Sequence, residues 1–250
     1  MVKAIMHGCN GRMGTIISEL AEKDDNIEIV AGIDPTGKGR FGYPVFYSID
    51  DCDVEADVVI DFSNASAVPQ LLTYCVDKQI PCVLCTTGLS AELIGEVAKA
   101  SEKVAMLKSA NMSLGINLLM KLLKEASQVL APAGFDIEIV EKHHNQKIDA
   151  PSGTALMLAN AINEELSGSM NYVYDRHSVR AKRQPNEIGI HAIRGGTIVG
   201  EHDIIFAGRD EVITLSHSAA SKEVFAVGAV NAAVYLSGKP AGIYDMQDMM

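Results

Sequence analysis

Two histidines and a lysine form the densest group of proton-transferring side chains in the sequence. His143, His144 and Lys147 follow a run with alternating apolar residues, and Pro-Ser-Gly-Thr at 151–154 then begins a helical pattern. A histidine can hold or release a proton near neutral pH, a lysine adds a positive charge, and the first amides of a helix bind a carboxylate. A single histidine in a strand is usually structural, but this spacing indicates a site that binds a small dianion and moves a proton.

A glycine-rich segment near the N-terminus indicates a second site. Gly8, Gly11 and Gly14 follow an apolar run directly and open a helical pattern. Glycines there allow a tight turn and let backbone amides approach a pyrophosphate. Asp34 ends the next apolar run, where a carboxylate can accept hydrogen bonds from ribose hydroxyls. The glycine spacing alone is weak evidence, but strand, glycines, helix and acid together predict a dinucleotide site.

Asp34 also bears on the choice of cofactor. A carboxylate repels a 2′-phosphate, and the uncharged Pro35 and Thr36 follow it, so we expect a modest preference for NADH over NADPH. Lys38 and Arg40 are close enough in sequence that use of both cofactors stays open.

These two groups lie on elements of different kinds. The first half of the chain alternates β-rich runs with helical patterns, which is typical of a doubly wound α/β fold, a Rossmann-like parallel sheet wrapped by helices. The expected strands are 2–7, 27–34, 58–62, 81–87 and 104–109, and the expected helices are 12–22, 65–75 and 91–100.

The pattern changes after Leu114 and predicts an α+β domain with a mixed or antiparallel sheet. Its expected helices are 116–130 and 153–166, and its expected strands are 135–144, 187–194, 197–207 and 212–217. The segment 225–237 is helical again, and its small residues suit close packing on the first domain. We therefore expect a dinucleotide-binding domain at 1–113, a substrate-binding domain at 114–221 and a C-terminal return to the first domain at 222–250.

Composition excludes several classes of partner and location. The net charge of −11 argues against a nucleic acid or an anionic membrane as partner, and no apolar run reaches the roughly 20 residues of a membrane span. The first residues do not form a secretory signal, and five cysteines without a pairing pattern indicate reduced thiols, so a cytoplasmic location is expected. Cys82 and Cys85 should point to opposite faces of a strand, and no metal site is expected. Six of the seven histidines lie in 114–221, which makes that segment the better candidate for binding an anion.

The motifs and their order resemble those of the dihydrodipicolinate reductase family, also called 4-hydroxy-tetrahydrodipicolinate reductases. The segments that carry the resemblance span nearly the whole chain: GCNGRMG at 8–14, CTTG at 85–88, SANMSLG at 109–115, EKHHNQKIDAPSGTA at 141–155, IRGGTIVGEH at 193–202 and YDM at 244–246. The string HHxxKxDAPSGTA is highly specific for that family.

The resemblance implies roles for individual residues. Asp34 would bind the adenosine ribose, His143 would be the catalytic acid/base and Lys147 the proton donor. The pyrophosphate would be held around Gly8, Cys9, Asn10, Gly11, Arg12 and Met13. The nicotinamide side would be held by Cys85, Thr86, Thr87, Ser109, Ala110, Asn111 and Met112. The substrate carboxylates would be bound by His144, Gly153 and Thr154.

Two positions depart from the family's pattern. Cys85 replaces the first glycine of the usual Gly-Thr-Thr-Gly, which makes a close backbone approach at this position an open question. Pro35 stands where members that favour the phosphorylated cofactor tend to carry a basic residue.

The implied reaction is the NADH- or NADPH-dependent reduction of 4-hydroxy-tetrahydrodipicolinate, a small dicarboxylate, to tetrahydrodipicolinate in diaminopimelate and lysine biosynthesis. Loss of water would give a cyclic imine, and hydride would reach ring C4. Lys147 would protonate the resulting enamine or support that step electrostatically, and His143 would be near enough to shuttle the proton. Hinge closure would join the two domains, and the family forms homotetramers through the sheet of the second domain, which would serve oligomerisation as well. Two alternatives share part of these features. Another reductase on the same scaffold, such as a homoserine-type or imine reductase, has no reason to hold the HHxxK string, and a non-enzymatic dinucleotide sensor has no need of Lys147.

Overall fold

The computed structural model describes all 250 residues, and the chain divides into two compact units. The first, which we call the N-terminal unit, combines Met1–Leu114 with Glu223–Met250. The second, the central unit, is Gly115–Lys222. None of the helices combines the length and the apolar character that crossing a lipid bilayer requires.

The N-terminal unit is built around a parallel sheet of seven strands in the order β12-β6-β5-β4-β1-β2-β3. The strands are β1 (Val2–His7), β2 (Ile27–Ile33), β3 (Val45–Phe46), β4 (Val58–Asp61), β5 (Cys82–Leu84), β6 (Ala105–Lys108) and β12 (Gly242–Tyr244). The strand order runs outward from β1 in both directions, so the sheet is doubly wound and its topological switch point lies between β1 and β4. Ligands of such sheets bind at the carboxyl ends of the strands beside this point.

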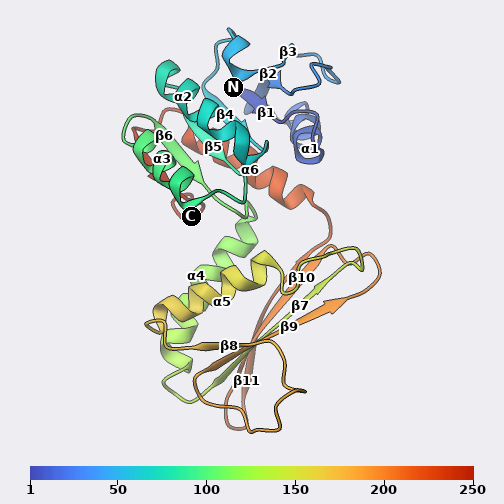
Figure 1. Ribbon diagram of the computed structural model, residues 1–250, viewed down its shortest axis with the longest axis vertical. Coiled ribbons are helices and arrows are strands. Elements are labelled where there is room, and N and C mark those ends of the chain that lie inside the picture. Colours follow the sequence, from blue (N-terminus) through green and yellow to red (C-terminus); the bar gives the residue numbers. More distant parts are fainter. The chain divides into compact units, whose positions relative to one another are not determined.

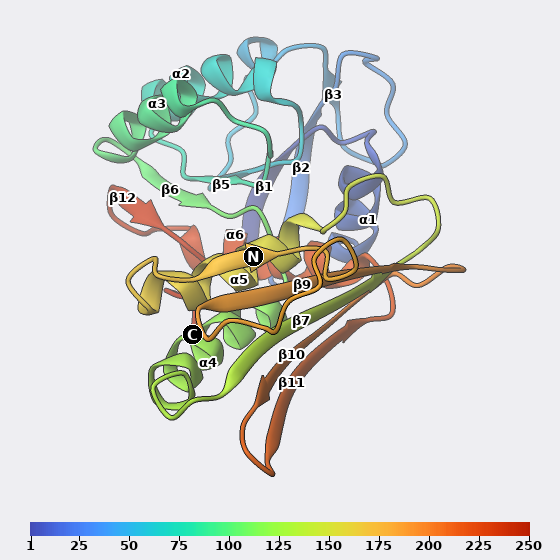
Figure 2. The same cartoon turned by 60° about the horizontal axis from the view of Figure 1, so that its bottom comes forward.

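Helices cover both faces of this sheet, as Figure 2 shows for the upper part of the view. The helices α1 (Arg12–Ala21) and α6 (Glu223–Leu236) pack on one face, and α2 (Val68–Lys78) and α3 (Ala91–Ser101) pack on the other. The strand residues alternate between the two cores because successive side chains of a strand point to opposite faces. Met6 and Ile60 therefore belong to the first cluster, and their neighbours Ile5 and Val59 belong to the second.

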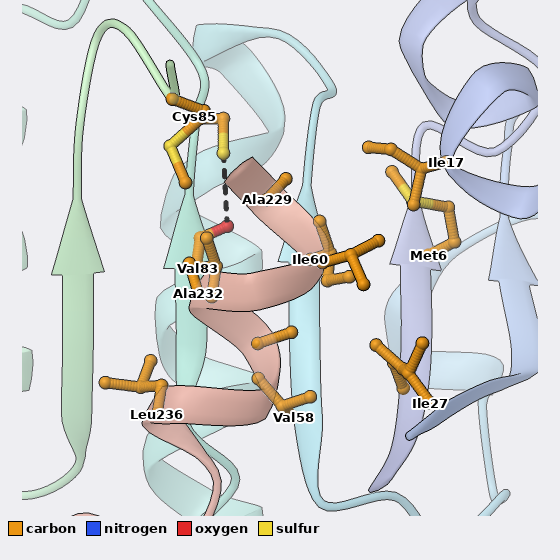
Figure 3. Packing of buried hydrophobic residues seen from close by; sticks show 14 of the residues in the cluster. Met6, Ile17, Ile27, Val58, Ile60, Val83, Cys85, Ala229, Ala232 and Leu236 are labelled. Atoms are coloured by element: carbon orange, nitrogen blue, oxygen red, sulfur yellow. Dashed lines mark hydrogen bonds between the residues drawn. The ribbon is translucent and has the colours of Figure 1, made fainter. Parts of the chain in front are cut away.

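Helix α6 returns the chain to the N-terminal unit and lies directly on the sheet (Figure 3). Ala229 and Ala232 are fully buried against strand residues such as Ile60 and Val83. A Cβ atom at Gly228 would lie 1.7 Å from the carbonyl oxygen of Met112, so only glycine fits there. The small residues therefore allow the helix backbone to approach the sheet closely.

The central unit is a mixed sheet of five strands, in the order β11-β10-β7-β9-β8, with helices on one face (Figure 1). Strands β8 (Asn171–Val173), β7 (Asp136–His143) and β9 (Glu187–Arg194) are parallel, whereas β10 (Gly200–Ala207) and β11 (Val212–Ala219) pair in antiparallel fashion. The helices α4 (Leu114–Leu130) and α5 (Gly153–Glu165) cover the face that carries Ile137, Ile204 and Phe206.

The predicted fold class is confirmed, and so is the placement of Cys82 and Cys85 on opposite faces of the first sheet. Three differences concern local boundaries. The short strands β3, β8 and β12 were not predicted, and β5 covers only three residues of the strand expected at 81–87. The helix expected at 65–75 begins as a 3₁₀ turn at Ala65–Ala67, capped by the side chain of Asn64, and α2 follows it as far as Lys78.

Candidate active site

The glycine-rich loop leaves β1 at a point where no other residue type fits. Gly8 has a φ of +83°, and a Cβ atom there would lie 2.7 Å from the carbonyl oxygen of Phe62. A Cβ atom at Gly14 would lie 2.2 Å from the carbonyl oxygen of Gly8. Helix α1 then begins without a side-chain cap, so no side chain competes for its first amides. This arrangement suits the binding of a pyrophosphate.

A cavity of about 330 Å³ lies beside this loop at the carboxyl ends of β1, β2 and β4. Gly8, Gly11 and Asp34 line it together, which brings three of the predicted cofactor residues to one place. Sequence reasoning missed the rest of the lining, which includes Tyr47, Ser48, Phe62, Ser63, Asn64 and Gln70. All of these except Gln70, which lies in the first turn of α2, follow strand ends in loops without a recognisable motif.

Asp34 is nearly buried and ready to accept hydrogen bonds. Its Oδ1 accepts hydrogen bonds from the backbone N–H of Thr36 at 2.9 Å and from the Thr36 hydroxyl at 2.6 Å. Burial would raise the pKa of Asp34, but the hydrogen bonds from Thr36 and Asn10 outweigh burial and hold the pKa below its ordinary value. The carboxylate is therefore ionised at neutral pH.

Asn10 ties the glycine-rich loop to the segment after Asp34. Its side-chain amide donates to the Thr36 hydroxyl at 2.9 Å and to the carbonyl oxygen of Lys38 at 2.8 Å. Arg40 lies near helix α1, with one guanidinium nitrogen 3.5 Å from the Thr15 hydroxyl. Both basic side chains of this segment are exposed, and Arg40 is held close to the helix that follows the glycine-rich loop.

The other predicted cofactor residues fall into two groups. Cys9, Cys85 and Met112 direct their side chains into the core between the sheet and helices α1 and α6, so only their backbone atoms can face a ligand. Burial raises the pKa of the Cys9 thiol to about 11 and raises that of Cys85 as well. The remaining residues lie at the carboxyl ends of β5 and β6, where Thr87 and Ala110 are exposed, as is Arg12 at the start of α1.

Cys85 stands where the family usually has a glycine, and the direction of its side chain decides whether it fills the space that the glycine would leave open. The Cys85 side chain points toward α6 (Figure 3), and its backbone N–H donates to the carbonyl oxygen of Asp61 at 3.0 Å. The cysteine therefore continues the strand pattern and keeps its sulfur away from the carboxyl edge of the sheet.

Buried polar side chains gather at one end of the sheet in the central unit. Strand β7 buries alternate residues, so the face that holds Ile137 and Ile139 also holds Glu141 and His143. Strand β10 does the same, and His202 continues the buried row of Ile204. A carboxylate and two imidazoles thus take positions where the pattern calls for apolar side chains. Such a departure is typical of a functional site.

Glu141 is the centre of this cluster and has no exposed surface. Its carboxylate accepts hydrogen bonds from His143 Nδ1 at 2.6 Å, from two nitrogens of Arg194 at 2.7 and 2.8 Å, and from the backbone N–H of Ser152 at 3.0 Å. Burial would raise the pKa of Glu141, but the hydrogen bonds, those of Arg194 foremost, hold it below its ordinary value. The ionised carboxylate fixes the orientation of the His143 ring. Nε2 of that ring lies toward Gly200, where a Cβ atom would approach it to 3.1 Å.

His202 and Ser152 complete the cluster. The Ser152 hydroxyl caps helix α5 by accepting from the N–H of Ala155, and it lies 3.1 Å from His202 Nε2. Burial and the neighbouring His143 lower the pKa of His202 to about 4, so its ring is neutral at neutral pH. Its ring lies edge-on to that of His143, with centroids 5.3 Å apart.

The predicted substrate-binding residues lie directly beside this cluster. Lys147 Nζ lies 2.9 Å from a carboxylate oxygen of Asp149, and the backbone N–H of Gly153 is near enough to the same carboxylate to help lower its pKa. The hydrogen bond from Lys147 is the main reason that the pKa of Asp149 lies below its ordinary value. Thr154 follows in the first turn of α5, and the half-buried His144 adjoins the turn at Gly196 through Asn145. The structure thus places a lysine ammonium and a helix amide where they hold one carboxylate.

Sequence reasoning singled out His143 but not its partners Glu141, Ser152, Arg194 and His202. The period of two in β7 was the signal that could have found Glu141, since it puts the acid in phase with Ile137 and Ile139. Arg194 and His202 could not be placed, because their positions depend on strand pairing with residues about 50 positions away.

The doubly wound unit, its glycine-rich loop and the separate proton-transfer cluster define the class of two-unit, dinucleotide-dependent oxidoreductases. Comparison with known proteins narrows this class. Models of the N-terminus and C-terminus of dihydrodipicolinate reductase match residues 2–112 and 115–250. The chain belongs to the dihydrodipicolinate reductase family, which confirms the resemblance seen in the sequence.

Individual relatives are similar to this chain over nearly their full length. The 4-hydroxy-tetrahydrodipicolinate reductase of Caldanaerobacter subterraneus subsp. tengcongensis is 54% identical, with 100% of this chain and 98% of the relative covered. The reductase of Clostridium tetani is 50% identical, with 100% and 97% covered. The solved structure of dipicolinate-bound dihydrodipicolinate reductase from Paenisporosarcina sp. TG-14 has the same fold, with a TM-score of 0.83, 24% identity and 100% of both chains covered.

Proposed function

We propose that this chain reduces 4-hydroxy-tetrahydrodipicolinate to tetrahydrodipicolinate, with NADH or NADPH as the hydride donor, in diaminopimelate and lysine biosynthesis. The observation that carries the proposal is the buried Glu141–His143 pair beside the carboxylate-binding group of Lys147 and Gly153. Family membership supports the reaction, and the dipicolinate in the Paenisporosarcina structure supports a planar dicarboxylate as ligand.

Lys147 and the start of α5 bind a substrate carboxylate in this proposal. Asp149 illustrates the capacity of this group, because its carboxylate is paired with the Lys147 ammonium at 2.9 Å and its pKa is lowered by Lys147 first and by the Gly153 amide as well. A substrate carboxylate takes the same donors, and Thr154 and His144 contribute at either side. The substrate carries two carboxylates, which accounts for a site that combines Lys147, the start of α5, Thr154 and His144.

His143 and Lys147 handle the proton. The hydrogen bond from His143 Nδ1 to the buried Glu141 fixes the ring and leaves Nε2 to exchange a proton. Lys147 protonates the enamine that follows hydride addition at ring C4, and His143 is close in sequence and on the adjoining strand end to resupply the proton. Glu141 remains ionised and holds the His143 ring through the hydrogen bond from Nδ1.

The N-terminal unit binds the cofactor, which supplies the hydride when it is bound. The amides at the start of α1 and of the loop Gly8–Met13 hold the pyrophosphate, and Asp34 accepts hydrogen bonds from the adenosine ribose. The cavity lined by Gly8, Gly11 and Asp34 fits this assignment. Thr86, Thr87 and the segment Ser109–Met112 form the nicotinamide side, with Cys9, Cys85 and Met112 contributing backbone atoms only. NADH is preferred modestly.

We also propose a homotetramer formed through the sheet of the central unit. β11 is an edge strand, and Val212 and Ile213 on it are exposed. An exposed strand edge of eight residues with apolar side chains favours pairing with another chain. Light scattering coupled to size-exclusion chromatography measures the mass and would contradict this assignment if it gave a monomer.

The central test is turnover. Purified protein is mixed with NADH and with the freshly generated product of dihydrodipicolinate synthase, and the loss of NADH absorbance is followed. We expect turnover that requires both the synthase product and Lys147. A protein that binds NADH but consumes none of it would be a dinucleotide sensor, and the proposed function would be wrong.

A further inference from the structure

Asp61 is a fully buried carboxylate that the reaction described above does not use. It ends β4, at the switch point between β1 and β4, and none of its side-chain surface is exposed. The three residues before it, Val58–Ile60, are buried and apolar, so the strand itself has no need of a charge at this position.

Three segments meet on this carboxylate. Oδ2 accepts a hydrogen bond from the Thr86 hydroxyl at 2.6 Å, and Oδ1 accepts from the Ser63 hydroxyl at 2.6 Å and from the Ser63 N–H at 3.2 Å. His7 Nδ1 lies 2.9 Å from Oδ1, but without the alignment of a hydrogen bond. The contacts therefore link the carboxyl ends of strands β1, β4 and β5.

These partners also border the proposed cofactor site. His7 and Ser63 line the cavity that holds Gly8 and Asp34, and His7 directly precedes Gly8 in the chain. Thr86 is buried, and its hydroxyl is directed to Asp61. The carboxylate thus joins the dinucleotide cavity to the segment assigned to the nicotinamide side.

A buried carboxylate is seldom the most stable choice for the interior of a sheet. Apolar residues of similar volume are often at least as stabilising at such a position, because a buried polar group must recover through hydrogen bonds the free energy that it loses on leaving water. The buried Asp61 therefore needs a reason beyond the stability of the sheet, and its place at the carboxyl edge supplies one.

We infer that Asp61 is a positioning residue for the cofactor, which fixes Thr86 through its hydroxyl and is itself held by Ser63 and by the contact with His7. This inference rests on the proposed function, because it takes the segment at Thr86 as the nicotinamide side. Asp61 touches neither ligand and acts through Thr86, so its loss should change binding of the cofactor and leave binding of the dicarboxylate alone.

The test compares Asp61→Asn with Asp57→Asn, a matched control just before the other end of β4, where Asp57 accepts a hydrogen bond from the N–H of Lys3. Calorimetry measures the Kd of NADH, which needs no turnover and suits a chain without tryptophan. We expect Asp61→Asn to raise the Kd and the KM of NADH about tenfold, which corresponds to about 1.4 kcal/mol. The KM of the dicarboxylate should change less than about twofold, and Asp57→Asn should leave all three constants unchanged within that limit.

Additional variants separate positioning from a structural role. Thr86→Val should weaken NADH binding to a similar degree, and the double variant with Asp61→Asn should be no weaker than either single variant, because both remove one contact. If Asp61→Asn does not fold, the variant that combines it with His7→Gln replaces both members of the buried contact by amides and gives the same measurement.

An unchanged Kd for NADH in a folded Asp61 variant overturns the inference, as does strict additivity with Thr86→Val. Failure of the proposed function is a separate result, since it appears in the wild-type turnover assay before any variant is made.

Discussion

Replacing Glu141 by glutamine removes one charge from the proton-transfer cluster and changes its shape very little. Glutamine has a single acceptor oxygen, whereas the carboxylate accepts from His143, from Arg194 and from the backbone N–H of Ser152. The new amide group must turn its own N–H groups toward at least one of these donors. The His143 ring then loses its fixed orientation, or Arg194 loses its counter-charge.

The size of the effect follows from these contacts. A hydrogen bond to a charged partner contributes about 1.5–3 kcal/mol, and each 1.36 kcal/mol is a factor of ten, so we expect kcat to fall about 10- to 150-fold. Breaking a buried ion pair on one side costs about 3–5 kcal/mol of stability. The variant should therefore fold but unfold at a lower urea concentration.

The pH dependence supplies an independent measurement. The folded-state pKa of Glu141 lies below its usual value of 4.5, so its contribution to stability is present above that value and is lost as the pH falls through the folded-state pKa. The stability difference between wild type and Glu141→Gln should be largest above about pH 5 and shrink below about pH 4.

Glu138→Gln is a matched control on the opposite face of β7. Glu138 also contacts two arginines and a histidine, namely Arg176, Arg183 and His191. This control should lose stability but keep kcat within about twofold of wild type. A folded Glu141→Gln enzyme with wild-type kcat, or equal losses of kcat in both variants, would refute the role given to Glu141.

Further changes test the remaining assignments. Lys147→Ala should lower turnover about 10²- to 10⁴-fold with NADH affinity nearly intact, and turnover within about threefold of wild type would contradict its role as proton donor. Gly153→Val should raise the KM of the dicarboxylate more than that of NADH. The variant should fold, because a Cβ atom at this position meets no neighbour. A change in the KM of NADH alone would show that the start of α5 binds the cofactor instead of the dicarboxylate. The ratio of kcat/KM for NADH to that for NADPH should be about ten in wild type. It should fall in Asp34→Ala because NADH is used less well, and it should fall in Pro35→Arg because NADPH is used better. A tenfold preference for NADPH that Asp34→Ala does not change would show that Asp34 does not bind the ribose. His202→Gln should make the free energy of unfolding depend less on pH. The pKa of His202 is about 4 in the folded protein and 6.5 when unfolded, so wild type should lose about 3 kcal/mol of stability as the pH falls from 6.5 to 4. Denaturation curves across that range measure this loss, and a variant with the same pH dependence as wild type would contradict burial of a neutral ring.

Strand β7 shows how far the sequence determines the site. The alternation of Ile137 and Ile139 predicts a strand with one buried face, and the same period places Glu141 and His143 on that face. The motif then singles out His143 by residue type. The partner Arg194 could not be predicted, because it lies 53 residues from Glu141 and reaches it through the parallel pairing of β7 with β9.

The cofactor site shows the same limit. The glycines and Asp34 follow from local spacing, since the turn, the helix start and the strand end lie close together in the chain. Asp61 carries no such signal, because its partner Thr86 is 25 residues away and its burial arises from the sheet order.

The fold was predicted best where elements are long and periodic. The strands β3, β8 and β12 have only two or three residues, and each forms because a neighbouring strand offers backbone partners. Such edges depend on tertiary pairing and leave no pattern in the sequence.

The return of the chain through α6 sets an order for folding during synthesis. Ala229, Ala232 and Leu236 fill one core of the N-terminal unit, yet the ribosome makes them only after the whole central unit. Until then, the sheet face that carries Ile60 and Val83 has no helix α6 to cover it. Translation of the central unit is therefore a period in which the nascent chain exposes an apolar surface, and a fragment that ends at Leu114 should need a chaperone or aggregate.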